Sequence, residues 1–208
     1  MTVTKIGIFG GTFNPIHRMH IKIALRALEQ IGLDKIIFVT AAMPPHKDNT
    51  YIVSGEQRHE MVKLAIKDYP KFEASSVEID RKGKSYTFYT LTEFRQAYPN
   101  DELFFIIGGD SLAYLHKWYR AEEFMKLCTF VVYPRDDDSG EKLQRECDWL
   151  YENYGTKSII LNAAEDNVSS TQIRGIVNSG LSADDYVPDT VAKYIRENKL
   201  YISGGEDR

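Results

Sequence analysis

The sequence lacks the features of secreted, membrane-spanning and nucleic-acid-binding proteins. Only two cysteines occur in 208 residues, Cys128 and Cys147, and neither belongs to a CxxC pair. No apolar run reaches the roughly 18 residues that a membrane helix needs, and the N-terminal residues lack a signal-peptide pattern. The net charge of −4 indicates no basic surface for nucleic acid. We therefore expect a cytoplasmic protein with no nucleic-acid or membrane partner.

Several common catalytic motifs are also missing. Residues 83–85, Gly-Lys-Ser, resemble the end of a Walker A loop, but Glu78 stands where the first glycine of that loop would be. Neither a GxGxxG dinucleotide fingerprint nor a GxSxG nucleophile elbow occurs. These absences disfavour a P-loop nucleotidase, a dinucleotide dehydrogenase and a serine hydrolase.

Apolar runs alternate with amphipathic segments along the whole chain. Strands are predicted at residues 6–9, 35–40, 72–79, 103–107, 128–133 and 157–161. Helices are predicted at about residues 17–31, 54–69, 85–98, 122–127, from 169 onward, and 188–199. This alternation predicts an α/β fold with a doubly wound parallel sheet. We expect residues 1–208 to form one domain, with a small helical part from about residue 169.

The first predicted strand ends in two glycines, and the helix after it begins with two histidines. Gly10 and Gly11 would let the backbone turn sharply and approach a ligand without a Cβ clash. His17 and His20 are three residues apart, so they share one face at the N-terminal end of the helix. Because such an end presents unpaired N–H groups and the positive end of the helix dipole, the two imidazoles suit a polyphosphate.

Other polar or glycine-containing segments follow later predicted strands. They are residues 44–47 (Pro-Pro-His-Lys), residues 108–110 (Gly-Gly-Asp), residues 133–135 and residues 169–174. The carboxyl ends of parallel strands lie at one edge of a sheet, so we expect all of these segments on the same rim. His46 and Lys47 would add two groups that can carry positive charge, although the proline pair before them could also be a simple turn.

Two of these segments carry the resemblance to a known family. Residues 10–20, GGTFNPIHRMH, resemble the GGTFDPIHxGH signature of the nucleotidyltransferase superfamily, and residues 169–174, SSTQIR, resemble its second signature, SSTxIR. Further segments contribute to the resemblance: residues 44–47, residues 85–87, and Gly109-Asp110 with Trp118. Together with the two signatures, they make nearly the whole chain look like bacterial nicotinate-nucleotide adenylyltransferases. Asn14 replaces the commoner aspartate. Met19 replaces the motif glycine, so its side chain must turn away or narrow the nucleotide site.

The resemblance implies a Rossmann-like nucleotidyltransferase fold and adenylyl transfer from ATP to nicotinate mononucleotide, in NAD biosynthesis. Mg²⁺ would arrive with ATP, no dedicated metal site is expected, and a homo-oligomer is possible. The implied catalytic residues are His17, His20, Lys47 and Arg174. The implied ATP-binding residues are Gly10, Gly11, Thr12, Phe13, Asp110, Ser170 and Thr171. The implied substrate-binding residues are Asn14, His46, Ser85, Tyr86, Thr87 and Trp118.

Some of these roles have a physical rationale and an alternative. Arg174 would make bidentate contacts with phosphate, or it would pair with Glu165 or Asp166. Asp110 would hold a ribose hydroxyl or help to place Mg²⁺. Ser85 is expected to cap the following helix, whose N-terminal N–H groups would then favour a carboxylate on the pyridine ring.

Two other functions fit the same residues. The histidines indicate the nucleotide and not the acceptor, so adenylyl or cytidylyl transfer to another phosphorylated acceptor is the nearest alternative. A nucleotide-binding regulator without catalysis is the alternative from a different class, and Met19 is its only support in the sequence.

Overall fold

The computed structural model describes residues 3–43, 52–134, 140–162 and 168–202, and its strands form one parallel sheet. The strands are β1 (Lys5–Gly11), β2 (Lys35–Thr40), β3 (Phe72–Ser75), β4 (Glu102–Gly108), β5 (Thr129–Tyr133) and β6 (Ser158–Ile160). Their order in the sheet is β3-β2-β1-β4-β5-β6. The order reverses direction between β1 and β4, which confirms the predicted doubly wound topology.

Helices connect the strands and extend the chain beyond them. They are α1 (Arg18–Ile31), α2 (Gly55–Ile66), α3 (Val77–Arg81), α4 (Thr87–Ala97), α5 (Gly109–Leu112), the 3-10 helix η2 (Leu115–Lys117), α6 (Ala121–Phe124), α7 (Gly140–Tyr154), α8 (Ser170–Asn178) and α9 (Asp189–Glu197). None of the helices in the described ranges is long and apolar enough to cross a membrane.

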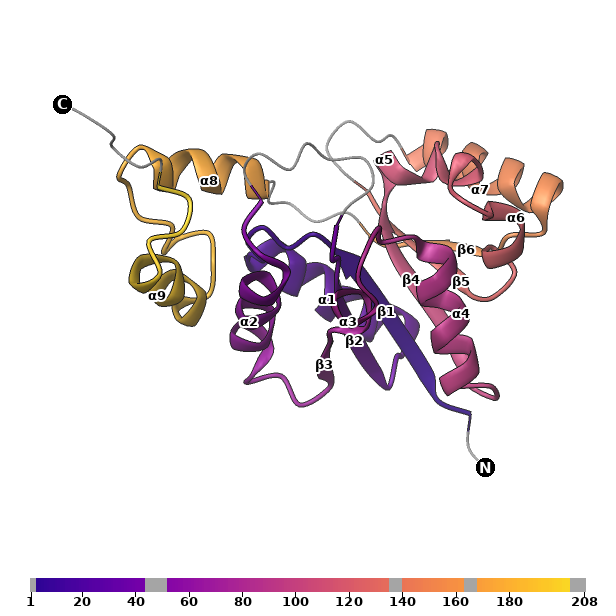
Figure 1. Ribbon diagram of the computed structural model, residues 1–208. Helices are drawn as coiled ribbons and strands as arrows, with labels where there is room; N and C mark the ends of the chain where they lie inside the picture. The colour runs from indigo at the N-terminus through magenta and orange to yellow at the C-terminus, as the bar shows by residue number, and fades with distance from the viewer. Residues whose placement is uncertain (1–2, 44–51, 135–139, 163–167, 203–208) are drawn as a thin grey trace.

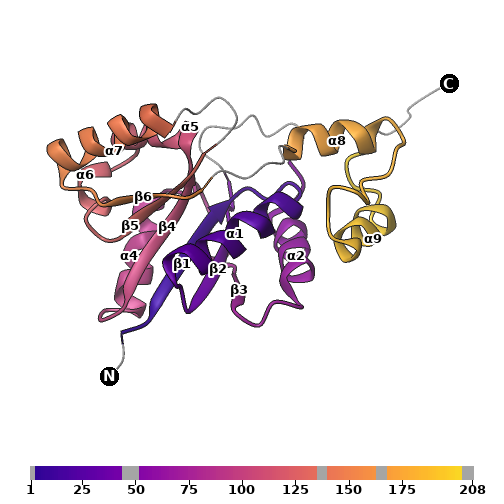
Figure 2. The ribbon, with the colours of Figure 1, turned by 180° about the vertical axis from the view of Figure 1, so that it is seen from behind.

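The sheet separates two hydrophobic clusters, because successive side chains of a strand point to opposite faces. On one face, Phe9 and Phe38 pack with the buried sides of α1, α2, α8 and α9. On the other face, Ile8 and Val39 pack with α4, α5, α6 and α7. Figure 1 shows α2 and α4 on opposite sides of the strands, and Figure 2 shows the same layers from behind.

The first helix forms as its sequence pattern predicts. Its buried face includes Ile23, Ala24 and Ala27, which lie against the sheet. Gly32 ends the helix in the left-handed conformation, with φ of 69°, and its N–H donates to the carbonyl of Leu28. The chain then returns as β2, parallel to β1, so the carboxyl ends of both strands reach the same rim.

Three segments differ from the predictions made from sequence. The predicted third strand stops at Ser75, and the short helix α3 takes up the residues that follow. The predicted helix at 54–69 ends at Ile66. The helix α7 was not predicted, although Leu143, Cys147 and Leu150 recur at helical spacing and form its buried face.

The C-terminal helices α8 and α9 lie at one side of the molecule, with α9 beside α2 (Figure 1). The hydroxyl of Thr190 in α9 donates to the carbonyl of Leu64 in α2, at 2.9 Å. Val191 and Ile195 of α9 are buried in the same cluster as Phe9. The helix α8 stands at the rim where the strands end, close to the start of α1 (Figure 2).

Candidate active site

The two glycines of the first signature lie inside a strand. β1 continues through Gly10 and Gly11, so the sharp turn predicted at these residues is wrong; Phe13, with φ of 47°, is the residue of this loop in the left-handed region. A Cβ on Gly11 would lie 2.8 Å from the Phe13 ring, and one on Gly10 would lie 3.3 Å from the Phe105 ring. Gly11 therefore leaves the space that the Phe13 ring occupies, whereas a side chain at Gly10 would require the Phe105 ring to shift by a few tenths of an ångström.

The two histidines form a close pair at the start of α1. His17 is the N-cap residue and is 5% exposed, and His20 lies in the first turn. Their ring centroids are 3.7 Å apart, with the ring planes inclined by 34°, which confirms the predicted shared face. The His17 N–H donates to Nδ1 of His20 at 3.2 Å. Because Nδ1 accepts, the neutral imidazole of His20 carries its proton on Nε2, where it can be donated to an anion.

The backbone N–H groups at the start of α1 are largely used within the protein. The N–H of His17 bonds to His20, and the N–H of Arg18 donates to the carbonyl of Tyr186 at 2.9 Å. The N–H of His20 donates to the carbonyl of His17 at 3.0 Å. These three N–H groups are therefore not the free donors that the sequence predicted.

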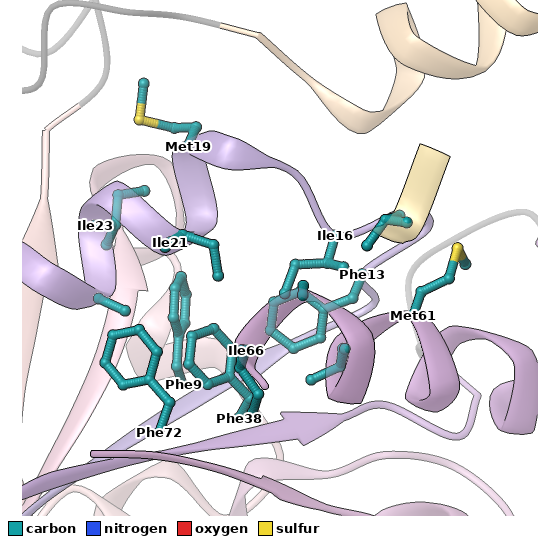
Figure 3. Packing of buried hydrophobic residues seen from close by; sticks show 14 of the residues in the cluster. Phe9, Phe13, Ile16, Met19, Ile21, Ile23, Phe38, Met61, Ile66 and Phe72 are labelled. Atoms are coloured by element: carbon teal, nitrogen blue, oxygen red, sulfur yellow. The ribbon is translucent and has the colours of Figure 1, made fainter. Parts of the chain in front are cut away.

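Aromatic rings hold the His20 imidazole in place. The Phe13 ring meets it edge to face, with 5.1 Å between ring centroids, and the Phe9 ring lies at 5.9 Å. Met19, on the neighbouring position of the helix, is 8% exposed and belongs to the hydrophobic cluster. Figure 3 shows its side chain directed away from Phe9 and Phe38. The methionine side chain is thus mostly buried, and its direction relative to a bound nucleotide stays a prediction.

Asn14 joins segments that are far apart in the sequence. Its Oδ1 accepts from the N–H of Val53, at 3.3 Å, and from the hydroxyl of Tyr201, at 3.0 Å. Its backbone carbonyl accepts from Nη1 of Arg174 at 2.9 Å. Asn14 is 3% exposed. A neutral amide oxygen suits these two donors, so the missing charge of the commoner aspartate leaves the hydrogen bonds intact.

The second signature begins α8 and packs directly on the first. Ser169 caps the helix in a capping box with Gln172. The Ser170 hydroxyl donates to the carbonyl of Pro15 at 3.0 Å, and Arg174 contacts Thr171 Oγ1 at 3.2 Å. The structure therefore places the two signatures side by side. We call residues 12–20 together with residues 170–174 the motif side of the rim.

A buried arginine that was not predicted from the sequence, Arg58, stabilises the motif side through hydrogen bonds. Arg58 in α2 is 1% exposed, and within the described residues its guanidinium donates four hydrogen bonds, all to backbone carbonyls. The acceptors are Val53 at 3.0 Å, Thr12 at 2.7 Å, Ala41 at 2.6 Å and Ala42 at 2.9 Å. One side chain thus ties the signature loop to the end of β2 and to the start of α2.

The positive charge of Arg58 contacts the loop of the first signature, which we expected to bind phosphates. Burial lowers the pKa of the Arg58 guanidinium, which nevertheless remains protonated at neutral pH. The sequence contained a signal for this residue. Arg58 stands three and seven positions before Met61 and Ala65, so it falls on the inward face of the predicted helix.

Asp110 follows β4 in the first turn of the short helix α5. Its carboxylate folds back over Gly108, because a Cβ there would lie 2.5 Å from Asp110 Oδ1 and 3.2 Å from the Tyr133 ring. Asp110 is exposed and stands beside the end of β5. It is thus on the predicted rim, with its carboxylate accessible to a ligand.

The segment at 85–87 is anchored differently from the prediction. Ser85 does not cap α4: the N-cap residue is Tyr86, without a side-chain cap bond. The Ser85 hydroxyl instead accepts from the N–H of Ala42 at 2.9 Å, and its own N–H donates to the carbonyl of Met43 at 3.0 Å. Ser85 therefore fastens the start of α4 to the residues that follow β2.

Aromatic rings gather around this segment. The Tyr86 ring lies 4.8 Å from the Tyr119 ring, and Tyr119 lies 5.9 Å from Tyr89. Trp118 is partly buried, with its ring centroid 6.3 Å from that of Phe124. We call residues 85–89 together with residues 118–119 the aromatic side of the rim. The predicted Tyr86, Thr87 and Trp118 thus belong to neighbouring segments, whereas His46 and Lys47 lie outside the described residues.

The family can now be assigned by comparison with known proteins. A sequence profile of the cytidylyltransferase-like family matches residues 8–176, which include both signatures. Nicotinate-nucleotide adenylyltransferase from Bacillus subtilis is 43% identical over 199 residues, covering 96% of this chain and 99% of the relative. The chain belongs to this adenylyltransferase family. A Clostridium botulinum (strain Eklund 17B) protein with the name "probable nicotinate-nucleotide adenylyltransferase" is 41% identical and covers 95% of the chain.

The solved structures agree on the fold. Nicotinic acid mononucleotide adenylyltransferase from Plasmodium falciparum, complexed with NaAD, superposes with a TM-score of 0.78. It is 18% identical in sequence, and the match covers 95% of this chain and 97% of that one. The family thus keeps the Rossmann-like nucleotidyltransferase fold at low sequence identity.

Proposed function

We propose that this member of the family transfers the adenylyl group of ATP to nicotinate mononucleotide, giving deamido-NAD and pyrophosphate in NAD biosynthesis. One observation carries the proposal most strongly. The second signature docks on the first through Ser170 to the Pro15 carbonyl and Arg174 to the Asn14 carbonyl, next to the histidine pair. Two imidazoles, a guanidinium and hydroxyls thus belong to two segments that contact each other on the rim. Such a set suits a polyphosphate.

The reaction needs positioning and charge stabilisation, and no covalent nucleophile. A phosphate oxygen of the mononucleotide attacks the α-phosphorus of ATP, the bond from that phosphorus to the bridging oxygen breaks, and pyrophosphate leaves. In our proposal, His17 and His20 donate to the oxygens at the α-phosphorus. Their stabilisation is greatest in the transition state, where charge spreads over those oxygens.

Other groups would bind the rest of the two nucleotides. Arg174 and Lys47 would bind the phosphates, while the backbone N–H groups of Ser170 and Thr171, at the N-terminal end of α8, would bind the leaving pyrophosphate. Asp110 would accept a ribose hydroxyl, because its carboxylate is exposed beside the ends of β4 and β5. We write Mg²⁺ as part of the substrate, the ATP–Mg²⁺ complex. That ion usually keeps several waters and uses substrate phosphates as ligands.

The aromatic side would recognise the pyridine ring. Trp118 is the aromatic residue we propose to stack on it. The first turn of α4 contains no acidic residue, so its N-terminal N–H groups favour a carboxylate over a carboxamide. A carboxamide would turn its own NH₂ toward one of these donors and leave that donor unpaired, at about 1–3 kcal/mol.

From this cost we expect the kcat/KM for nicotinate mononucleotide to exceed that for nicotinamide mononucleotide by about tenfold to a few hundredfold. Steady-state kinetics with each acceptor at saturating ATP measures the ratio. Equal efficiencies, or a preference for the amide, would contradict the proposed carboxylate recognition and leave adenylyl transfer standing.

The experiment that tests the function itself is pyrophosphate release from ATP against a panel of pyridine mononucleotides. We expect release with nicotinate mononucleotide and a dinucleotide product of the matching mass. Release with a different phosphorylated acceptor, or with CTP in place of ATP, would support the nearest alternative. Nucleotide binding without any release would indicate the regulator.

A further inference from the structure

The end of the chain contacts the first signature directly. After α9 ends, residues 198–201 run back toward the rim, and Leu200 is buried at 6% exposure in the cluster that contains Phe13 and Ile16. Lys199 and Tyr201 adopt the left-handed conformation, with φ of 50° and 64°. Non-glycine residues seldom adopt it, and two within three positions show that the surrounding contacts hold this segment in one shape.

The contact ends in a hydrogen bond between residues 187 positions apart. The Tyr201 hydroxyl lies 3.0 Å from Asn14 Oδ1. The same Asn14 atom receives the backbone N–H of Val53 at 3.3 Å, so it must be the amide oxygen, and the tyrosine must be the donor. Burial raises the pKa of the Tyr201 hydroxyl, although the charges of Arg174 and Arg58 act in the opposite direction. The hydroxyl therefore keeps its proton throughout the neutral range and always donates.

The position of Asn14 matters for the catalytic groups. It lies three residues before His17, and its carbonyl is the acceptor that orients the Arg174 guanidinium. A shift of this asparagine would therefore displace both a histidine of the pair and the arginine of the second signature. Catalytic geometry of this kind is sensitive to displacements of about 1 Å.

We propose that Tyr201 is a positioning residue of the active site: its hydroxyl fixes Asn14, and through Asn14 it sets His17 and Arg174 for the reaction. This inference rests on the proposed adenylyl transfer. It extends the functional site beyond the two signatures, to the segment that follows the last helix. It also assigns Asn14 to holding the loop, in place of the predicted contact with the substrate.

The test is Tyr201→Phe, which removes the hydroxyl and keeps the ring. Asn14 keeps its bond to Val53, so the fold should survive. We expect kcat to fall about five- to tenfold, the loss of one hydrogen bond, while the KM values for ATP and mononucleotide stay within about twofold. A hydroxyl with only a structural role would lower the melting temperature and leave kcat unchanged.

Two controls make the result specific. Tyr194→Phe removes a nearby partly buried hydroxyl that makes no hydrogen bond with the described part of the chain, and kcat should stay at the wild-type value. In an Asn14→Ala background the hydroxyl has lost its acceptor, so adding Tyr201→Phe should change kcat by less than about twofold.

The outcomes separate this inference from the function on which it rests. If the wild-type enzyme is active and Tyr201→Phe matches Tyr194→Phe in kcat, the positioning role is wrong and the proposed function stands. An undiminished effect of Tyr201→Phe in the Asn14→Ala background would overturn the role as well. A wild-type enzyme that releases no pyrophosphate with any pyridine mononucleotide contradicts the function, and the positioning role falls with it.

Discussion

The motif side and the aromatic side of the rim are built by different interactions. On the motif side, short hydrogen bonds from Arg58, Arg174 and Ser170 hold backbone carbonyls of one loop in place. On the aromatic side, ring contacts predominate, and Tyr89 and Tyr119 are exposed at 39% and 46%. A hydrogen-bonded loop has one favoured position, whereas exposed rings can change their orientation when they contact a ligand.

This difference suggests a division of labour. Transfer at the α-phosphorus needs groups that do not move during the reaction, and buried hydrogen bonds supply that rigidity. Recognition of a planar ring needs area and orientation, which aromatic side chains supply without a dense hydrogen-bond network. We therefore expect substitutions on the motif side to change kcat and substitutions near the aromatic side to change the KM of the acceptor.

The largest effect is expected from the histidine pair. His17→Ala or His20→Ala should lower kcat by about 10² or more, because each removes a donor that stabilises the transition state. Steady-state pyrophosphate release measures this loss, and thermal unfolding checks the fold. His116→Ala is the matched control: His116 lies on η2, contacts Trp149 of α7 and is outside the histidine pair, so its loss should leave kcat unchanged. Near-normal turnover in either variant of the pair would remove the proposed mechanism.

Two arginines allow a direct comparison of the sides. Arg58→Lys keeps the positive charge, but a single ammonium cannot donate to carbonyls on three segments at once. We therefore expect kcat to fall about tenfold and the free energy of unfolding to fall by about 2–4 kcal/mol. Arg81 bonds to Thr90 and Glu93 and fastens α3 to α4. Arg81→Lys should raise the KM of the acceptor and leave kcat and the KM of ATP nearly unchanged. The division of labour would be wrong if both variants changed the same constant.

The smallest effect on activity is expected at Met19. Because the side chain is buried in the hydrophobic cluster, Met19→Gly should cost about 2–5 kcal/mol of unfolding free energy. The KM of ATP should stay within about twofold when the assay runs well below the melting temperature. Met19→Leu keeps the volume and should cost less than about 1.5 kcal/mol. A large rise in kcat for Met19→Gly would show that the methionine obstructs the site.

Much of the fold could be predicted because its signals are local. The apolar run at 103–107 and the helical spacing at 17–31 depend on neighbouring residues, and both predicted elements are confirmed. The helix α7 was missed because its charged residues outnumber the three that it buries. The strand predicted at 72–79 is shorter in the structure, because Ser75 ends it and the helix α3 begins at Val77.

The site was predictable where a motif lies within one segment, and less so where it depends on contacts across the chain. His17 and His20 share a helix turn, so their spacing alone places them together. Ser85 was assigned to the helix that follows it, because its real partner, Ala42, is 43 residues away. The roles of Arg58 and Tyr201 likewise depend on distant backbone and side-chain acceptors, which a pattern along the sequence does not reveal.

The most direct test of the account is the ratio of kcat/KM for nicotinate mononucleotide to that for nicotinamide mononucleotide, measured in the wild-type enzyme and in His20→Ala. If the motif side performs the transfer and the aromatic side chooses the acceptor, both efficiencies should fall by the same factor of about 10² or more. The ratio should then agree within about twofold between the two enzymes. A ratio that collapses toward one in His20→Ala would show that the histidine takes part in choosing the acceptor, and it would contradict the division of labour.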